Sequence, residues 1–235
     1  VTIGKLSVLV ILLDDQQESC GDDKEVWNLI RRFEEVISND EIVEKAEDNW
    51  FISALRNVWQ EFVSQTPRWW RKRFAAEIKT LIAAFFEETK IGKFPTVTEY
   101  FSLRPILVGM NISFMLGEFA KNQYLSEYDR ASIALQEFCS TAYMVGMLTN
   151  DVFSYKYEKE NGFNLMKVYK KYHQLNEAEA ASKVVDLLEK HMSLYKIKRK
   201  LIMLPACGWF YDVIDVVVKG LFEYELASPR YDIPY

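Results

Sequence analysis

The chain has 235 residues, of which 49% are hydrophobic, 14% aromatic and 27% charged, and its formal net charge is −5. This composition excludes a disordered protein, and the acidic balance argues against a nucleic-acid partner. Three widely spaced cysteines, Cys20, Cys139 and Cys207, indicate reduced thiols in a cytoplasmic protein rather than a disulfide framework. Two histidines argue against a histidine-based zinc site.

The chain opens with an apolar run, KLSVLVILL, that ends in three acids, Asp14, Asp15 and Glu18. The run is too short to cross a bilayer, so no membrane span is expected. The acids have two interpretations: they mark the point where a core helix reaches water, or they face a cation. Because the chain begins at Val1 without a methionine, we expect the natural protein to extend further.

Helical periodicity dominates the rest of the chain, and alternating β-branched residues are nearly absent. We expect helices over residues 25–38, 49–64, 69–89, 96–117, 127–159, 177–200 and 205–224. No linker rich in Gly, Ser or Pro interrupts them. The sequence therefore predicts an all-α fold, with residues 1–235 forming a single domain of helices packed around a common centre.

The apolar helices carry many aromatic residues, among them Phe114, Tyr143 and Trp209. Packing in the core is the ordinary interpretation of a buried aromatic side chain. The alternative is the wall of a cavity, where aromatic faces would stabilise a passing carbocation.

A second polar stretch, TNDVFSYKYEKE, also follows an apolar helix. Asn150, Ser154 and Glu158 are four residues apart, so a helix would place all three oxygens on one face. An amide, a hydroxyl and a carboxylate together form the hard oxygen site that Mg²⁺ prefers. Taken alone, the stretch could equally be the solvated end of a helix.

Two arginines stand in apolar surroundings, Arg104 in FSLRPILVG and Arg230 in ASPRY. Such a side chain commonly extends its charged end to solvent. The guanidinium fork also matches the oxygens of a diphosphate.

These features form one pattern. Asp14 begins a DDxxE run and Asn150 begins an NDxxSxxxE run. Arg104 lies 46 residues before Asn150 (150 − 104), and Arg230 lies 80 residues after it (230 − 150) and precedes Tyr231. The combination resembles the class I terpene synthases, in particular the single-domain microbial and coral type.

The resemblance implies an α-helical bundle around a central apolar cavity with metal ions at its mouth. It implies three Mg²⁺ ions, with Mn²⁺ as an alternative. The implied metal ligands are Asp14, Asp15, Glu18, Asn150, Ser154 and Glu158. The implied diphosphate-binding residues are Arg104, Lys159, Arg230 and Tyr231, with Arg104, Arg230 and Tyr231 also serving in catalysis.

The implied reaction is the ionisation of a linear prenyl diphosphate, followed by cyclisation to a terpene and release of diphosphate. The implied cavity residues are Phe114, Tyr143, Trp209, Tyr224, Val108 and Gly109. The substrate can be farnesyl (C15) or geranylgeranyl (C20) diphosphate. The sequence does not decide whether the protein is a monomer or a homodimer.

The chain departs from the family pattern in its DDxxE motif, where DDxxD is usual. Tyr157 stands where many relatives carry a basic residue, which leaves that role to Lys156, to Lys159 or to neither. The resemblance also implies several helices before Asp14, so the N-terminal helices are expected to be missing. The alternatives are a prenyl-chain-elongating synthase and a non-catalytic helical protein that binds isoprenoids or acts as a scaffold.

Overall fold

The computed structural model describes residues 1–20, 24–39, 49–91, 94–158, 162–201 and 207–228, and side chains 13–20, 25 and 26 are outside this description. The described residues form helices and connecting turns, with no strand among them, which confirms the predicted all-α fold. The contacts divide the chain into two compact units, Val1–Lys90 and Ile91–Tyr235. None of the described helices is long and apolar enough to span a membrane.

The described part of the first unit forms α1 (Thr2–Cys20), α2 (Lys24–Ser38), α3 (Trp50–Gln65) and α4 (Arg68–Ile91). α3 packs against both α1 and α2. The core of the first unit is aromatic. The rings of Trp70 and Phe74 are stacked with their centroids 4.8 Å apart, and Trp59 is buried beside them. The buried guanidinium of Arg71 donates to the carbonyl of Val63 at 3.2 Å, which satisfies an acceptor at the C-terminal end of α3.

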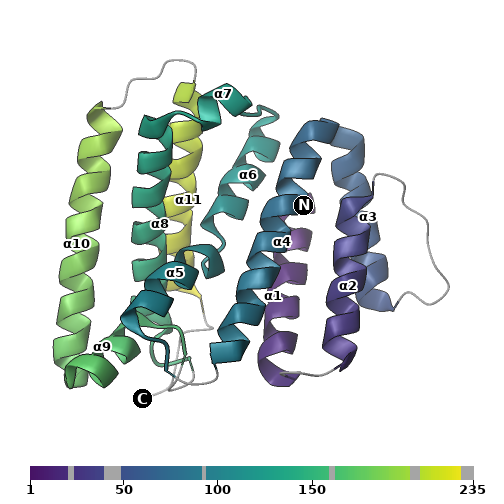
Figure 1. The fold of residues 1–235 in the computed structure, drawn as a ribbon. Coiled ribbons are helices and arrows are strands. Elements are labelled where there is room, and N and C mark those ends of the chain that lie inside the picture. Colours follow the sequence, from purple (N-terminus) through teal and green to yellow (C-terminus); the bar gives the residue numbers. More distant parts are fainter. Residues whose placement is uncertain (21–23, 40–48, 92–93, 159–161, 202–206, 229–235) are drawn as a thin grey trace. The chain divides into compact units, whose positions relative to one another are not determined.

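The second unit contains the remaining helices: α5 (Val97–Leu107), α6 (Met110–Lys121), α7 (Glu127–Arg130), α8 (Ile133–Ser154), α9 (Leu165–His173), α10 (Glu177–Leu201) and α11 (Gly208–Ala227). α8 packs against α10 and α11, and α11 also packs against α6 (Figure 1). α9 contacts α5, α8 and α10. α8 is therefore the central helix of this unit, and its C-terminal end lies close to α5 and α9.

Two glycines allow helices of the second unit to approach closely. A Cβ atom added to Gly117 on α6 would lie 2.2 Å from Cγ1 of Val213 on α11. A Cβ atom added to Gly146 on α8 would lie 2.7 Å from Sδ of Met110. Both distances are shorter than a van der Waals contact, so a Cβ atom at either position would require Val213 or the more flexible Met110 to shift.

The segment expected to be helical over 96–117 is interrupted. α5 ends at Leu107, and Gly109 adopts a left-handed conformation (φ 67°) before α6 begins at Met110. Glycine takes this backbone conformation without the steric penalty that a side chain would bring. The break falls at Val108 and Gly109, two of the residues that the resemblance implies for the cavity.

The helix expected over 127–159 is wrong in its bounds. A short α7 precedes it, and α8 runs only from Ile133 to Ser154. The backbone N–H groups of Tyr157 and Glu158 both donate to the carbonyl of Ser154, so the chain turns on itself after the helix ends. α9 was not predicted, because nine residues give too short a periodic pattern to stand out.

Candidate functional site

The end of α8 carries the polar residues of the second motif. Ser154 is the last residue of the helix, and its Oγ donates a hydrogen bond to Oε1 of Glu158. The turn after α8 therefore keeps Glu158 beside Ser154, although Glu158 is not helical. Asn150 lies one turn earlier on α8, and its Oδ1 accepts a hydrogen bond from Nη2 of Arg104.

Arg104 is buried rather than extended to solvent, which corrects the ordinary expectation for an isolated arginine. Its Nε donates to Oδ1 of Asp151 at 2.8 Å, and its Nη2 lies 2.7 Å from the same oxygen. Nη2 also lies 3.8 Å from Oε1 of Glu158. The hydrogen bonds that Arg104 makes within the described part of the chain use Nε and Nη2, which leaves Nη1 for another acceptor.

Asp151 is a fully buried carboxylate that accepts hydrogen bonds from two other helices, α5 and α9. Besides Arg104, it accepts from the hydroxyl of Tyr100 at 2.6 Å and from the backbone N–H of Leu165 at 2.6 Å. Its backbone carbonyl accepts from Nδ2 of Asn164, the N-cap residue of α9. Asp151 thus ties α5 and α9 to α8 and fixes where Arg104 points.

Burial and charge act in opposite directions on this network. Burial raises the pKa of Asp151, while Arg104 and the hydrogen bond from Tyr100 oppose that change. Burial by itself would lower the pKa of Arg104, but Asp151 and Glu158 outweigh it and raise this pKa. Burial and Asp151 also raise the pKa of Tyr100. Arg104 therefore stays charged, with a carboxylate held against it.

Glu158 has an unsatisfied oxygen. Its Oε2 is buried and has no hydrogen-bond partner among the described residues. Burial is the main cause that raises the pKa of Glu158 to about 7, while Arg104 acts against it. The ammonium group of Lys167 on α9 donates to the backbone carbonyl of Glu158, which anchors this turn. A buried carboxylate oxygen without a partner suits a bound cation.

The residues present fit a metal ion. Asn150, Ser154 and Glu158 supply an amide, a hydroxyl and a carboxylate oxygen around Arg104, and these are ligands that Mg²⁺ accepts. Among the side chains that the structure describes, no group of three or more His, Cys, Asp or Glu forms a metal site. The candidate metal ligands in the described part of the site are therefore two neutral oxygens, from an amide and a hydroxyl, and one carboxylate.

The remaining predicted site residues are not placed with this group. Asp14, Asp15 and Glu18 lie on α1 in the first unit, and their side chains are outside the described ones. Lys159, Arg230 and Tyr231 fall outside the described residues altogether.

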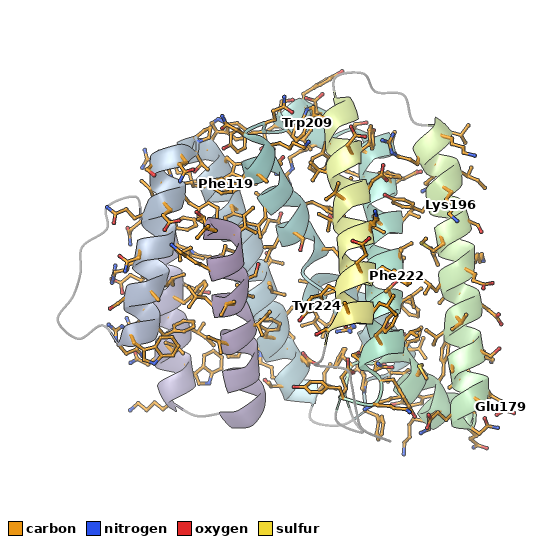
Figure 2. All side chains as sticks on the ribbon, turned by 180° about the vertical axis from the view of Figure 1, so that it is seen from behind. Phe119, Glu179, Lys196, Trp209, Phe222 and Tyr224 are labelled. Carbon is orange, nitrogen blue, oxygen red and sulfur yellow. The ribbon has the colours of Figure 1, made fainter. Side chains whose placement is uncertain are left out.

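The residues predicted to line a cavity have varied surroundings. Phe114 is buried and stacks on Tyr143 at 5.5 Å, and the Tyr143 hydroxyl donates to Asn111. Trp209 and Tyr224 stand toward opposite ends of α11 (Figure 2). Their separation of 15 residues (224 − 209) corresponds to about 22 Å along a helix. Tyr224 is half-exposed, whereas Trp209 packs against the core of the second unit.

Several residues of the network were not predicted from the sequence. They are Tyr100, Asp151, Asn164, Lys167 and Glu225. Two of them had a local signal. Tyr100 precedes Arg104 by one helical turn and so shares its face of α5, and Asp151 follows Asn150 directly. Asn164 and Lys167 follow the end of α8, 13 and 9 residues from their partners, and Glu225 lies 75 residues from Asn150, so none of them shares a helix face with the motif.

Comparisons with known proteins identify the family of this chain. The family model for terpene synthase family 2, C-terminal metal binding, matches residues 5–193, and the chain belongs to this family. It is therefore a class I terpene synthase, an enzyme of a metal-binding family. A comparison with curated protein sequences gave no match.

Solved structures share the fold. The chain is similar to an a-eudesmol synthase with 18% identity and a TM-score of 0.84, covering 97% of this chain and 79% of that one. It is similar to the linalool/nerolidol synthase from Streptomyces clavuligerus in complex with 2-fluorogeranyl diphosphate, with 14% identity, a TM-score of 0.82 and coverage of 94% and 80%.

A third similar structure is the 2-methylisoborneol synthase from Streptomyces coelicolor in complex with Mg²⁺ and 2-fluoroneryl diphosphate. Its identity is 19% and its TM-score 0.80, with 98% of this chain and 77% of that one covered.

Proposed function

We propose that this enzyme ionises a linear prenyl diphosphate in a Mg²⁺-dependent reaction and cyclises the resulting cation to a terpene, with release of diphosphate. The observation that carries this proposal is the group formed by Arg104, Asn150, Ser154 and Glu158. The guanidinium of Arg104 lies close to three side chains whose oxygens can bind a metal ion. Oε2 of Glu158 is buried without a hydrogen-bond partner among the described residues.

Asn150, Ser154 and Glu158 are proposed to hold one Mg²⁺ ion. When bound, Mg²⁺ neutralises negative charge on the leaving diphosphate. Arg104 is proposed to bind the diphosphate through Nη1, because Asp151 and Asn150 already engage Nε and Nη2. The rigid buried partner of Arg104 means that its fork is oriented before the substrate arrives.

Further ligands are proposed on the basis of the sequence pattern. Asp14 is proposed as the main metal ligand of the first motif, with Asp15 and Glu18 as weaker ones, so that three ions bind in all. Lys159, Arg230 and Tyr231 are proposed to bind the diphosphate. Family membership supports a metal cofactor in general.

The apolar residues are proposed to shape the product. Phe114, Tyr143, Trp209 and Tyr224, with the helix break at Val108 and Gly109, would line the cavity that folds the substrate chain. Aromatic faces would stabilise cationic intermediates, and exclusion of water would prevent early quenching. Replacing Phe114 by leucine should change the product mixture more than the rate.

The first experiment uses the purified protein with geranyl, farnesyl and geranylgeranyl diphosphate, each with Mg²⁺ and with EDTA. Geranyl diphosphate is included because two similar structures hold analogues of that length. We expect a cyclic hydrocarbon or alcohol, detected by gas chromatography and mass spectrometry, in the Mg²⁺ samples alone. Folded protein that releases no diphosphate from any of the three substrates would overturn the proposal.

Variants test the ligand assignment. Asn150→Ala, Ser154→Ala and Asp14→Asn should each lose most turnover while their circular dichroism stays helical. Ser140→Ala is the matched control, because Ser140 lies on the same helix but is exposed, and its hydroxyl donates to the carbonyl of Gln136 within α8. Turnover equal to the wild type in the Asn150 and Ser154 variants would remove these residues from the metal site.

A further inference from the structure

The side chain of Asn150 is held at both ends of its amide. Its Oδ1 accepts from Arg104, and its Nδ2 donates to Oε1 of Glu225 at 2.6 Å. Glu225 lies on α11, 75 residues further along the chain, and is 2% exposed. A buried carboxylate thus contacts the residue that the proposed function uses as a metal ligand.

An asparagine amide can rotate by 180° and exchange its oxygen and nitrogen with almost no change in shape. Only the oxygen binds a metal ion, because the NH₂ group has no lone pair available for coordination. Rotation at Asn150 would turn the NH₂ group toward the donor of Arg104 and the oxygen toward the carboxylate of Glu225. Both contacts would then be repulsive, so the two neighbours permit a single orientation.

Glu225 also affects the electron distribution of the amide. A carboxylate that accepts from Nδ2 draws the amide toward its charge-separated form and increases the negative charge on Oδ1. This polarisation is stronger in a buried site, where the effective dielectric constant is low. Residues that bond to a metal ligand in this way orient it and raise its affinity for the ion.

We propose that Glu225 is a positioning residue that orients and polarises the amide of Asn150 so that Oδ1 binds the metal ion. This inference rests on the proposed function, in which Asn150 is a ligand. Arg104 alone does not supply the effect on Nδ2, because it contacts only the oxygen end of the amide.

The test measures metal binding without turnover. The melting temperature is recorded as Mg²⁺ is added in the presence of inorganic diphosphate, and the Mg²⁺ concentration that gives half of the full increase is compared between variants. The variants are Glu225→Leu, which removes the acceptor, and Glu225→Gln, which keeps a carbonyl oxygen able to accept from Nδ2. Glu223→Gln is the control, because Glu223 lies on the same helix with a side chain 63% exposed.

We expect Glu225→Leu to raise the half-saturating Mg²⁺ concentration by about 10- to 100-fold, the usual effect of losing a group that supports a metal ligand. Glu223→Gln should stay close to the wild type, and Glu225→Gln should give a smaller rise than Glu225→Leu, because it keeps an acceptor for Nδ2 but loses the charge that polarises the amide. In turnover assays, the loss in Glu225→Leu should shrink as Mg²⁺ is raised. An unchanged Mg²⁺ requirement in folded Glu225→Leu would overturn the inference.

An exchange of donor and acceptor makes the test independent of that variant's folding. Asn150→Asp places two carboxylates against each other, whereas combining it with Glu225→Gln restores a donor–acceptor pair. Mg²⁺ should therefore bind more tightly to the double variant than to Asn150→Asp alone, although Glu225→Gln brings no gain beside the natural Asn150. An equal effect of Glu225→Gln in both backgrounds would exclude a direct role on residue 150.

Different results would contradict the proposed function and the role of Glu225. A wild type that shows no shift with Mg²⁺ and diphosphate would overturn the proposed function and this inference together. A wild type that shifts normally, with Glu225→Leu shifting at the same Mg²⁺ concentration, would overturn only the inference.

Discussion

Nε of Arg104 lies 2.8 Å from Oδ1 of Asp151, and this carboxylate is fully buried between α5, α8 and α9. The contact turns an arginine with several rotatable bonds into a fixed donor beside Asn150 and Glu158. Its cost is the burial of two charges, which is tolerated only while each has the other. The first two predictions test this dependence.

Asp151→Asn should lower the free energy of unfolding by about 3–5 kcal/mol, because the buried charge of Arg104 loses its counter-ion. Urea or guanidinium unfolding followed by circular dichroism measures this change. Asp212→Asn is the control, since Asp212 pairs with Arg199 at the surface with its side chain 65% exposed. An exposed pair contributes about 1 kcal/mol or less. Equal losses in the two variants would contradict a special role for the buried pair.

Tyr100→Phe should destabilise the fold by about 1.5–3 kcal/mol, the usual contribution of a hydrogen bond to a charged group. The ring stays in place, so the change isolates the hydroxyl that donates to Asp151 at 2.6 Å. Tyr128→Phe, at a position 88% exposed, should leave the unfolding midpoint unchanged. A Tyr100→Phe variant as stable as the wild type would show that its hydroxyl does not support Asp151.

Gly117→Ala should destabilise the second unit by about 1–3 kcal/mol, because the added methyl group would overlap Val213. Gly220→Ala should instead stabilise the fold by up to about 1 kcal/mol, since alanine favours a helix more than glycine. A Cβ atom at Gly220 meets nothing within 4 Å. Thermal melts of both variants compare the signs, and the same sign for both would argue against the close α6–α11 approach.

Cys139 and Cys207 should resist alkylation at pH 8 in the folded protein. Burial is the main cause that raises the pKa of Cys139 to about 12 and of Cys207 to about 11. A raised pKa means less of the reactive thiolate at a given pH, here roughly one part in a thousand or fewer. Peptide mapping after iodoacetamide, with and without guanidinium, checks this result. Rapid labelling of either residue in native protein would contradict it.

The helices could be predicted from the sequence because their apolar periodicity is local. The pattern over 177–200 corresponds to α10 (Glu177–Leu201), and that over 25–38 corresponds to α2 (Lys24–Ser38). The end of α8 could not be predicted, because the turn after Ser154 keeps a near-helical spacing. The periodicity of a sequence does not distinguish the last turn of a helix from a separate turn that follows it with similar hydrogen bonds.

The candidate site was predictable only in part. Asn150, Ser154 and Glu158 belong to one short stretch of chain, so their spacing can be seen in the sequence. In the structure they lie together next to Arg104. The two side chains that bond to Asn150, Arg104 and Glu225, lie 46 and 75 residues away from it in sequence. Such contacts depend on how helices pack, which a single sequence does not reveal.

Asn150 and Asp151 are adjacent on α8 and both bond to Arg104, but only Asp151 is a fully buried charge, whereas Asn150 carries the oxygen proposed to bind the metal ion. A survey that scores single substitutions by product formation would find both positions intolerant and could not separate them. A survey that scores cellular abundance would separate them, because only changes at Asp151 should send the protein to degradation. Measuring product formation and abundance together would therefore show which of two neighbouring residues on one helix is needed for the reaction and which for the fold.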